Sequence, residues 1–339
     1  MSAQFDAIIP KGSLLLVTGV NGLVGSHVAN EALALGFRVR GVVRDAKKAD
    51  GLKKTWDAKY PGQFEVAVVE DATKEGAFDE VVKGVSGFAH VSAIAGGFPS
   101  DLDLAIHDVK AITFRALEAA AKEPSVKRVV LTSSVVAARN DLREQDGFVG
   151  QDSWNDESVE LAKEDGPMQP FHVYMASKAV GEKAAWEWVE QHKPSYEFYT
   201  VNPCFVVGKV LDASQSGSTS GWVRDLYHNK PSPFLTDVPA LTWVGARDIA
   251  LLHLGGLLLP TSTVAPQRLF GGAGSANAND FLALFRRLNP SEEYPKDFEG
   301  KTEVKGTLDT EGSLAVLKAF GREGWTGFEE AVKELVAAN

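Results

Sequence analysis

Short, almost uniformly apolar runs alternate along the first two hundred residues with longer segments of helical periodicity. Uniform apolar runs are typical of parallel strands that are covered on both faces, whereas apolar positions three and four apart indicate helices. This alternation predicts an α/β fold with a doubly wound parallel sheet. The expected strands are 14–17, 37–43, 64–69, 87–91, 127–134 and 196–201, and the expected helices begin near 24, 51, 74, 103 and 171.

The first strand runs directly into a glycine-rich turn, which reads TGVNGLVG, and a helix follows at once. Glycines let the backbone approach a pyrophosphate closely, and the helix N-terminus offers N–H groups and positive partial charge. The order of strand, turn and helix therefore predicts a Rossmann-type dinucleotide site, with a purely structural turn as the alternative. The residues expected to bind the cofactor here are Thr18, Gly19, Asn21, Gly22, Leu23, Val24 and Gly25.

Cationic residues follow the second strand, at the position that contacts the adenosine ribose in such folds. Arg44 with Lys47 or Lys48 would pair with the 2′-phosphate of NADP, whereas an acid would bind the 2′-hydroxyl of NAD. Asp45 lies close enough to compete, and a solvated basic turn is a further alternative. We favour Arg44 and Lys48 as phosphate ligands, because a carboxylate among three cations more often serves as their partner.

The ends of the next two strands supply further expected cofactor contacts. Asp71, followed by Ala72, would face the adenine edge or else cap a helix over 74–83. Small residues from Ser92 and Ala93 onward would let the nicotinamide ribose approach the strand end.

From Gly208 the pattern changes to helices with short strands between them. Helices are expected at 222–227, 247–258, 277–288, 313–319 and 328–336, with short strands near Trp243 and at 269–270. We therefore expect a dinucleotide-binding domain over 1–207 and a smaller, mostly helical substrate lobe over 208–339, with short segments exchanged between them.

Composition narrows the function classes. The 339 residues carry a net charge of −10 without a basic cluster, which excludes nucleic acid as the main partner. The most apolar late stretch is too short to span a bilayer, and the N-terminus is no secretory signal, so we expect no membrane association. The lone Cys204 cannot form an internal disulfide, which favours the reducing cytoplasm. Seven scattered histidines lack metal-ligand spacing, so no metal site is expected.

Three residues form a candidate catalytic group. Ser134 ends the fifth strand, and Tyr174 and Lys178 lie four residues apart on the next long helix, so they share one face. A reduced nicotinamide that delivers hydride to a carbonyl needs a proton donor for the oxygen. Tyrosine can donate that proton if a nearby ammonium lowers its pKa, and a serine hydroxyl can orient the carbonyl.

These motifs together resemble a known family. TGVNGLVG, LTSS and YMASK resemble the extended short-chain dehydrogenase/reductases, and VRGVVRD and NPCFVVG resemble their dihydroflavonol reductase and cinnamoyl-CoA reductase branch. WDAKYPG, SVKRVVLTSS, SGSTSGW, LLHLG and GREGW are similar to fungal NADPH-dependent carbonyl (aldehyde) reductases over nearly the whole chain.

The resemblance implies NADPH-dependent reduction of aldehydes and activated ketones, including β-keto esters. It places the catalytic serine at Ser134, the tyrosine at Tyr174 and the lysine at Lys178, and it makes Arg44 the phosphate ligand and Asp71 the adenine-side acid. It also implies a monomer, or a homodimer formed through 103–122 and 171–191. Further residues expected at the cofactor are Ser133, Pro203, Val206 and Ser218.

One position departs from the family pattern. Many members carry an asparagine in the helix before the serine strand, where it serves a proton relay, and this chain has Val109 there. The relay would then use Lys178, ribose hydroxyls and water. Candidate substrate-pocket residues are Phe98, Val135, Phe171, Phe205, Trp222 and Leu226.

Two alternatives share the fold. A nucleotide-sugar epimerase or dehydratase would hold NAD and bind a diphosphate, and a dinucleotide-sensing protein would have lost catalysis. Arg44 disfavours the first alternative, and the retained Tyr174 and Lys178 disfavour the second.

Overall fold

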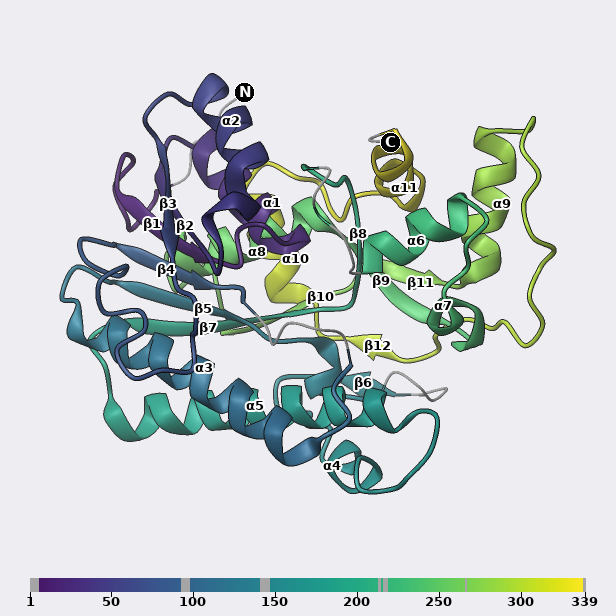
Figure 1. The fold of residues 1–339 in the computed structure, drawn as a ribbon, viewed down its shortest axis with the longest axis horizontal. Helices are drawn as coiled ribbons and strands as arrows, with labels where there is room; N and C mark the ends of the chain where they lie inside the picture. Colours follow the sequence, from purple (N-terminus) through teal and green to yellow (C-terminus); the bar gives the residue numbers. More distant parts are fainter. Residues whose placement is uncertain are drawn as a thin grey trace.

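A seven-stranded sheet forms the centre of the protein (Figure 1). The structure is a computed structural model that describes residues 6–92, 98–140, 147–212, 215, 219–265 and 267–337. All six neighbouring strand pairs are parallel, in the order β10-β7-β5-β4-β1-β2-β3. The strands are β1 (Leu14–Thr18), β2 (Arg38–Val43), β3 (Phe64–Val68), β4 (Gly87–His90), β5 (Arg128–Thr132), β7 (Glu197–Pro203) and β10 (Arg268–Gly271).

The chain reverses direction across the sheet between β1 and β4. From β1 it continues outward through β2 and β3, and then returns to place β4 on the other side of β1. Loops at the carboxyl ends of β1 and β4 therefore diverge, which is where ligands bind in doubly wound sheets. The predicted fold class is confirmed.

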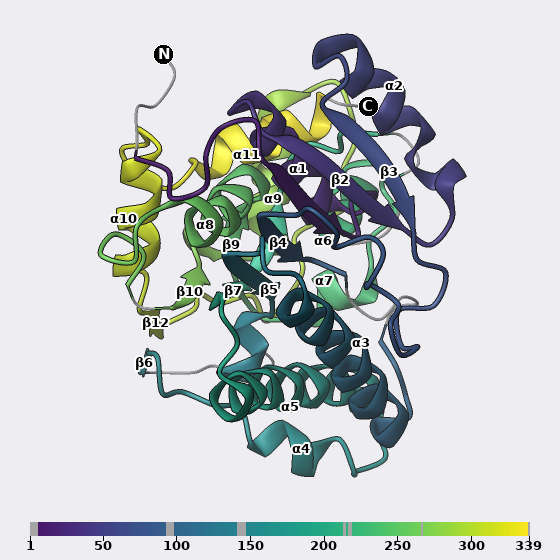
Figure 2. The same ribbon diagram turned by 90° about the vertical axis from the view of Figure 1, so that its left-hand side faces the viewer.

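Helices cover both faces of this sheet, as the two perpendicular views show (Figures 1 and 2). α3 (Leu102–Lys122) and α5 (Gln169–His192) pack together on one face, and the short α4 (Glu157–Leu161) packs on α5. α1 (Leu23–Ala34), α8 (Ala246–Leu258) and α10 (Glu311–Ala319) cover the other face, and α2 (Asp50–Lys59) contacts β3. Because both faces are covered, β1 is buried along its whole length.

The later part of the chain builds a smaller lobe beside the sheet. Its three-stranded sheet contains β8 (Phe205–Val207), β9 (Leu241–Gly245) and β11 (Gly274–Ala276). A separate apolar core forms there, with Phe281 and Phe285 fully buried. The helices of this region are α6 (Thr219–Tyr227), α7 (Pro233–Asp237), α9 (Ala278–Leu288) and α11 (Phe328–Val336). A separate two-stranded sheet joins β6 (Phe148–Val149) from earlier in the chain with β12 (Thr307–Leu308).

One predicted element is wrong. Residues 74–83 form a series of turns instead of a helix. Gly76 adopts the left-handed conformation with φ of 72°, which interrupts helical geometry near its start. Phe78 and Val82 are nevertheless buried against the sheet, so the apolar spacing that suggested a helix is satisfied by the turns. Tertiary packing overrides the local pattern here.

Candidate active site

A cavity of about 1020 Å³ follows the carboxyl edge of the sheet and continues into the smaller lobe. It brings together most of the residues that the sequence singles out. Of the predicted cofactor residues, the following line it: Gly19, Asn21, Gly22, Leu23, Val24, Gly25, Arg44, Lys48, Asp71, Ala72, Ser92, Ser133, Pro203 and Val206. Of the predicted catalytic and pocket residues, these line it: Ser134, Tyr174, Lys178, Phe98, Val135, Phe171, Phe205 and Trp222. Ala93 and Ser218 lie outside the described residues.

The glycine turn is shaped to receive a ligand at the start of α1. Gly19 has φ of 64°, and its carbonyl accepts a hydrogen bond from the Gly22 N–H at 2.9 Å. A Cβ on Gly25 would lie 2.3 Å from the Gly19 carbonyl oxygen, so no larger residue fits without moving the turn. Gly22 is the N-cap of α1 and has no side chain to cover the first N–H groups. These features fit a dinucleotide pyrophosphate.

Thr18, which the sequence predicts at the cofactor, is not among the residues that line the cavity. Its side chain is fully buried, and Oγ1 accepts hydrogen bonds from the N–H groups of Val91 and Ser92, both at 3.0 Å. The same hydroxyl lies 3.1 Å from His90 Nδ1. Thr18 therefore ties the end of β1 to the chain that leaves β4. Burial, assisted by the Lys178 charge, lowers the pKa of His90 to about 3, so that ring stays neutral.

Charged side chains surround the other end of the glycine turn. Arg44 and Lys48 are exposed and line the cavity. Asp45 also lines it, but its carboxylate caps the 3₁₀ helix Ala46–Ala49 by accepting from the Lys47 N–H. The carboxylate thus binds the backbone of Lys47, a role that the sequence did not predict.

Asp71 shapes a turn at the end of the third strand. Its carboxylate accepts hydrogen bonds from the Thr73 hydroxyl at 2.6 Å and from the Thr73 N–H at 3.0 Å, and these bonds lower its pKa. Since no helix follows, helix capping is excluded for this residue, and Asp71 stays at the cavity wall.

The three candidate catalytic residues, Ser134, Tyr174 and Lys178, line the same cavity. Ser134 follows β5, and its hydroxyl lies 3.4 Å from the Pro203 carbonyl, to which it donates. Tyr174 and Lys178 face the same space from α5, with the Lys178 Nζ 6.0 Å from the centre of the Tyr174 ring.

Protein surrounds the Lys178 ammonium on most sides. Loss of hydration lowers its pKa to about 8, and the negative charge of Glu182 opposes that decrease. The lysine therefore carries its charge near neutral pH, and it lines the same cavity as a phenol and a serine hydroxyl. Such an arrangement can polarise a carbonyl and supply a proton to it.

Aromatic rings form the part of the cavity that enters the smaller lobe. Phe98 and Phe171 lie 4.2 Å apart between ring centres, and Trp222 lies 5.9 Å from Phe98. Phe234 completes this wall, stacked on Phe171 at 4.6 Å and packed on Trp222 at 4.8 Å. The sequence analysis missed Phe234, although the preceding Pro233 is a typical first residue of a helix.

Leu226 of this lobe is placed differently from expectation. Leu226 is fully buried in the core of the lobe and does not line the cavity, because it lies one helical turn after Trp222 on α6 and packs on the apolar side chains of the lobe. Cys204, the lone cysteine, is buried and lines the cavity.

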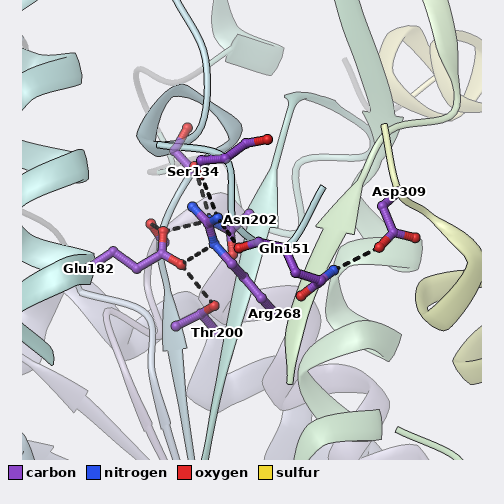
Figure 3. Close-up of polar contacts among 9 residues, drawn as sticks. Ser134, Gln151, Glu182, Thr200, Asn202, Arg268 and Asp309 are labelled. Carbon is purple, nitrogen blue, oxygen red and sulfur yellow. Dashed lines mark hydrogen bonds and ion pairs between the residues drawn. The ribbon is translucent and has the colours of Figure 1, made fainter. Parts of the chain in front are cut away.

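The sequence analysis also did not predict a buried polar network between α5, which carries Tyr174 and Lys178, and the sheet (Figure 3). Glu182 on α5 binds side chains from β7 and β10, including Arg268 at 2.8 Å. The signal was present, since Glu182 follows Lys178 by four residues and so shares its helical face. Val109 faces α5 at Gly181 from α3.

Comparisons with known proteins find a family profile, related sequences and a similar fold. The profile of the NAD dependent epimerase/dehydratase family matches residues 15–255. Aldehyde reductase 2 of Sporidiobolus salmonicolor is 44% identical over 98% of both chains, and the ketoreductase adrE of Penicillium roqueforti is 36% identical over 99% of both. The crystal structure of a yeast methylglyoxal/isovaleraldehyde reductase complexed with NADPH superposes with a TM-score of 0.79. It covers 96% of this chain and 97% of its own, at 24% identity, and so supports the fold.

Proposed function

Because the chain belongs to the NAD-dependent epimerase/dehydratase family, the extended short-chain dehydrogenase/reductases, we propose that it reduces aldehydes and activated ketones to alcohols with NADPH. Relatives of similar length are named aldehyde reductase and ketoreductase. The observation that carries the proposal is the continuity of one cavity from the glycine turn to Ser134, Tyr174 and Lys178.

The residues at the cofactor end have the chemistry that NADPH requires. The turn from Gly19 to Gly25 would hold the pyrophosphate, and the exposed Arg44 and Lys48 would pair with the 2′-phosphate. NADPH, when bound, would supply a hydride to the carbonyl carbon.

Each central residue then has a defined task. The Ser134 hydroxyl donates a hydrogen bond to the substrate carbonyl oxygen and fixes its orientation. The Tyr174 hydroxyl gives that oxygen its proton, and the Lys178 ammonium stabilises the tyrosinate that remains. The surrounding side chains limit water access, which strengthens these charge interactions.

The aromatic wall favours substrates whose carbonyl bears an apolar group, including the ester arm of a β-keto ester. Among the described residues, the lysines and arginines that line the cavity are Arg44 and Lys48 at the cofactor end and Lys178 at the catalytic group. No further lysine or arginine of the described residues lines the part of the cavity in the smaller lobe. A phosphate or diphosphate placed beside Phe98, Phe171 and Phe234 would lose its hydration without gaining a cation. The same composition disfavours nucleotide-sugar epimerisation, the main alternative within the family.

Oxidation of NADPH, followed by its absorbance, tests the proposal directly. We expect turnover with aldehydes, β-keto esters and diketones, and weak turnover with substrates that carry phosphate. Purification with firmly bound NAD and no reductase activity would contradict it.

Replacement of the proton donor gives the largest expected loss of activity. The Y174F variant should lose about 10²- to 10⁴-fold in kcat, because the phenol supplies the proton, while its NADPH dissociation constant stays within a few-fold. Y227F is the matched control, since Tyr227 lies in the lobe against Phe285. Full activity in Y174F would refute the assignment.

A further inference from the structure

Glu182 is a buried carboxylate with four side-chain donors around it. Its side chain is 0% exposed. It accepts hydrogen bonds from the Ser133 hydroxyl at 2.5 Å, the Asn202 amide at 2.7 Å, the Thr200 hydroxyl at 3.1 Å and Arg268 Nε at 2.8 Å. Figure 3 shows Glu182 of α5 together with Thr200 and Asn202 of β7 and Arg268 of β10. The sites on both oxygens are used, so the carboxylate has one fixed orientation.

Arg268 offsets the cost of burying this charge. Besides Glu182, it donates to the backbone carbonyls of Gln151 and Ser153 at 2.8 and 2.7 Å, and its guanidinium lies 3.9 Å from the centre of the Trp154 ring. A buried ion pair of this kind seldom adds stability relative to apolar residues of the same volume. The position of the Glu182–Arg268 pair therefore suggests a role other than stability.

That position is one helical turn from Lys178, next to the catalytic serine. Glu182 shares a face of α5 with Tyr174 and Lys178. A small cavity of about 20 Å³, which is room for one water molecule, lies between α3, α5 and β5, and Lys178, Glu182 and Ser133 are among its lining residues. Asn202 also donates to the Ser134 carbonyl at 3.2 Å, so the network holds the backbone of the catalytic serine as well.

The other charged or titratable groups near Lys178 cannot supply this negative charge equally well. Tyr174 contributes its phenol from the same helix, and His90 on β4 is neutral because burial lowers its pKa. Asp108 on α3 lines the main cavity but is partly exposed, so water screens its charge. Arg268 is bonded to the Glu182 oxygen opposite the one that binds Ser133.

We propose that Glu182, held by Arg268, is a positioning residue that keeps Lys178 charged during turnover and fixes the Ser133–Ser134 backbone beside the substrate. This role rests on the proposed reductase function. Without the Glu182 charge, Lys178 would lose its proton at lower pH, and Tyr174 would then lose the cation that makes it an effective proton donor. The alkaline limb of the reduction rate should therefore move to lower pH.

The test measures Lys178 directly as well as turnover. In protein labelled with ¹³C at the lysine ε-carbon, K178R identifies the Lys178 signal. In E182Q we expect the titration midpoint of that signal to fall by about one unit or more, with the alkaline limb of kcat falling in parallel. NADPH affinity should stay within a few-fold. E182D keeps the negative charge, so its Lys178 titration midpoint should lie closer to that of the wild type than the midpoint in E182Q does.

Two further variants keep the result interpretable. E182L/R268M replaces the pair by apolar residues, so it should fold even if E182Q does not, and its midpoint should also be lowered. R128M is the matched control, because Arg128 is equally buried, begins β5 at the opposite end of the sheet and pairs with Glu197. It should lower the melting temperature and leave the midpoint unchanged.

The proposal would be overturned if the Lys178 midpoint were unchanged in both E182Q and E182L/R268M, or if R128M shifted it equally. The titration is read without substrate. If the wild-type protein reduces no carbonyl but E182Q still lowers the Lys178 midpoint, the reductase function is contradicted and the charge coupling between Glu182 and Lys178 stands.

Discussion

The two ends of the cavity are built by different means. At the cofactor end, consecutive residues of one turn, Gly19 to Gly25, form the binding surface, and exposed cations stand next to it. At the substrate end, aromatic rings come from three separate parts of the chain, at Phe98, Phe171 and the α6–α7 region. The first end depends on backbone geometry and charge, and the second on side-chain volume.

This difference predicts how each end responds to mutation. The glycine turn has no space for an added side-chain carbon, so one such carbon should disturb all of its phosphate contacts together. An aromatic wall shares its contacts among several rings, so loss of one ring should weaken binding only of the substrates that fill that space. Substitutions at the two ends should thus affect cofactor and substrate separately.

Of the substitutions at the two ends of the cavity, one in the glycine turn should have the largest effect. In G25A, the new Cβ would lie 2.3 Å from the Gly19 carbonyl oxygen, so the turn must shift. Its N–H groups would then no longer point toward the phosphates. We expect the NADPH dissociation constant to rise by about 100-fold, equivalent to two lost charge-assisted hydrogen bonds. Fluorescence titration measures it, and G166A, where the added Cβ meets open space, should bind normally.

A smaller effect is expected at the cation that would contact the 2′-phosphate. R44A should lower kcat/KM for NADPH by about 10- to 100-fold while changing the value for NADH little, because NADH lacks that phosphate. K54A removes an exposed cation from α2 and should leave both values near wild type. Equal losses with the two cofactors would show that Arg44 does not discriminate between them.

The smallest effect is expected at the aromatic wall. F234A should raise KM for an aryl ketone by about 10-fold and leave KM for a short aliphatic aldehyde within two-fold, since only the larger substrate contacts the ring. NADPH affinity should not change. F328L, in the same lobe but packed on Trp243 and Phe281, is the control. If F234A affected both substrates equally, the ring would serve the fold and not selectivity.

Each end was also visible to a different degree in the sequence. The glycine turn, Arg44, Tyr174 and Lys178 were placed at the cavity in advance because each belongs to a contiguous stretch with a regular period. The prediction for Leu226 was wrong, since the predicted segment 222–227 covers only six residues of α6 and leaves its buried face undetermined. Phe234 was missed because α7 is five residues long and carries no periodic signal. The absent helix at 74–83 shows the same limit.

Among the described residues, no helix is long and apolar enough to cross a membrane, and no group of histidine, cysteine, aspartate or glutamate is placed to hold a metal.

By itself, the sequence determined the parallel sheet, the dinucleotide turn and the helical face shared by Tyr174 and Lys178, because strand burial, glycine geometry and helical spacing are properties of neighbouring residues. Only the tertiary structure decided that Arg268, eighty-six residues after Glu182, is its ion-pair partner, and that Phe98 and Phe234 share one wall. Such contacts depend on how sheet and lobe pack together, and no local pattern encodes that packing.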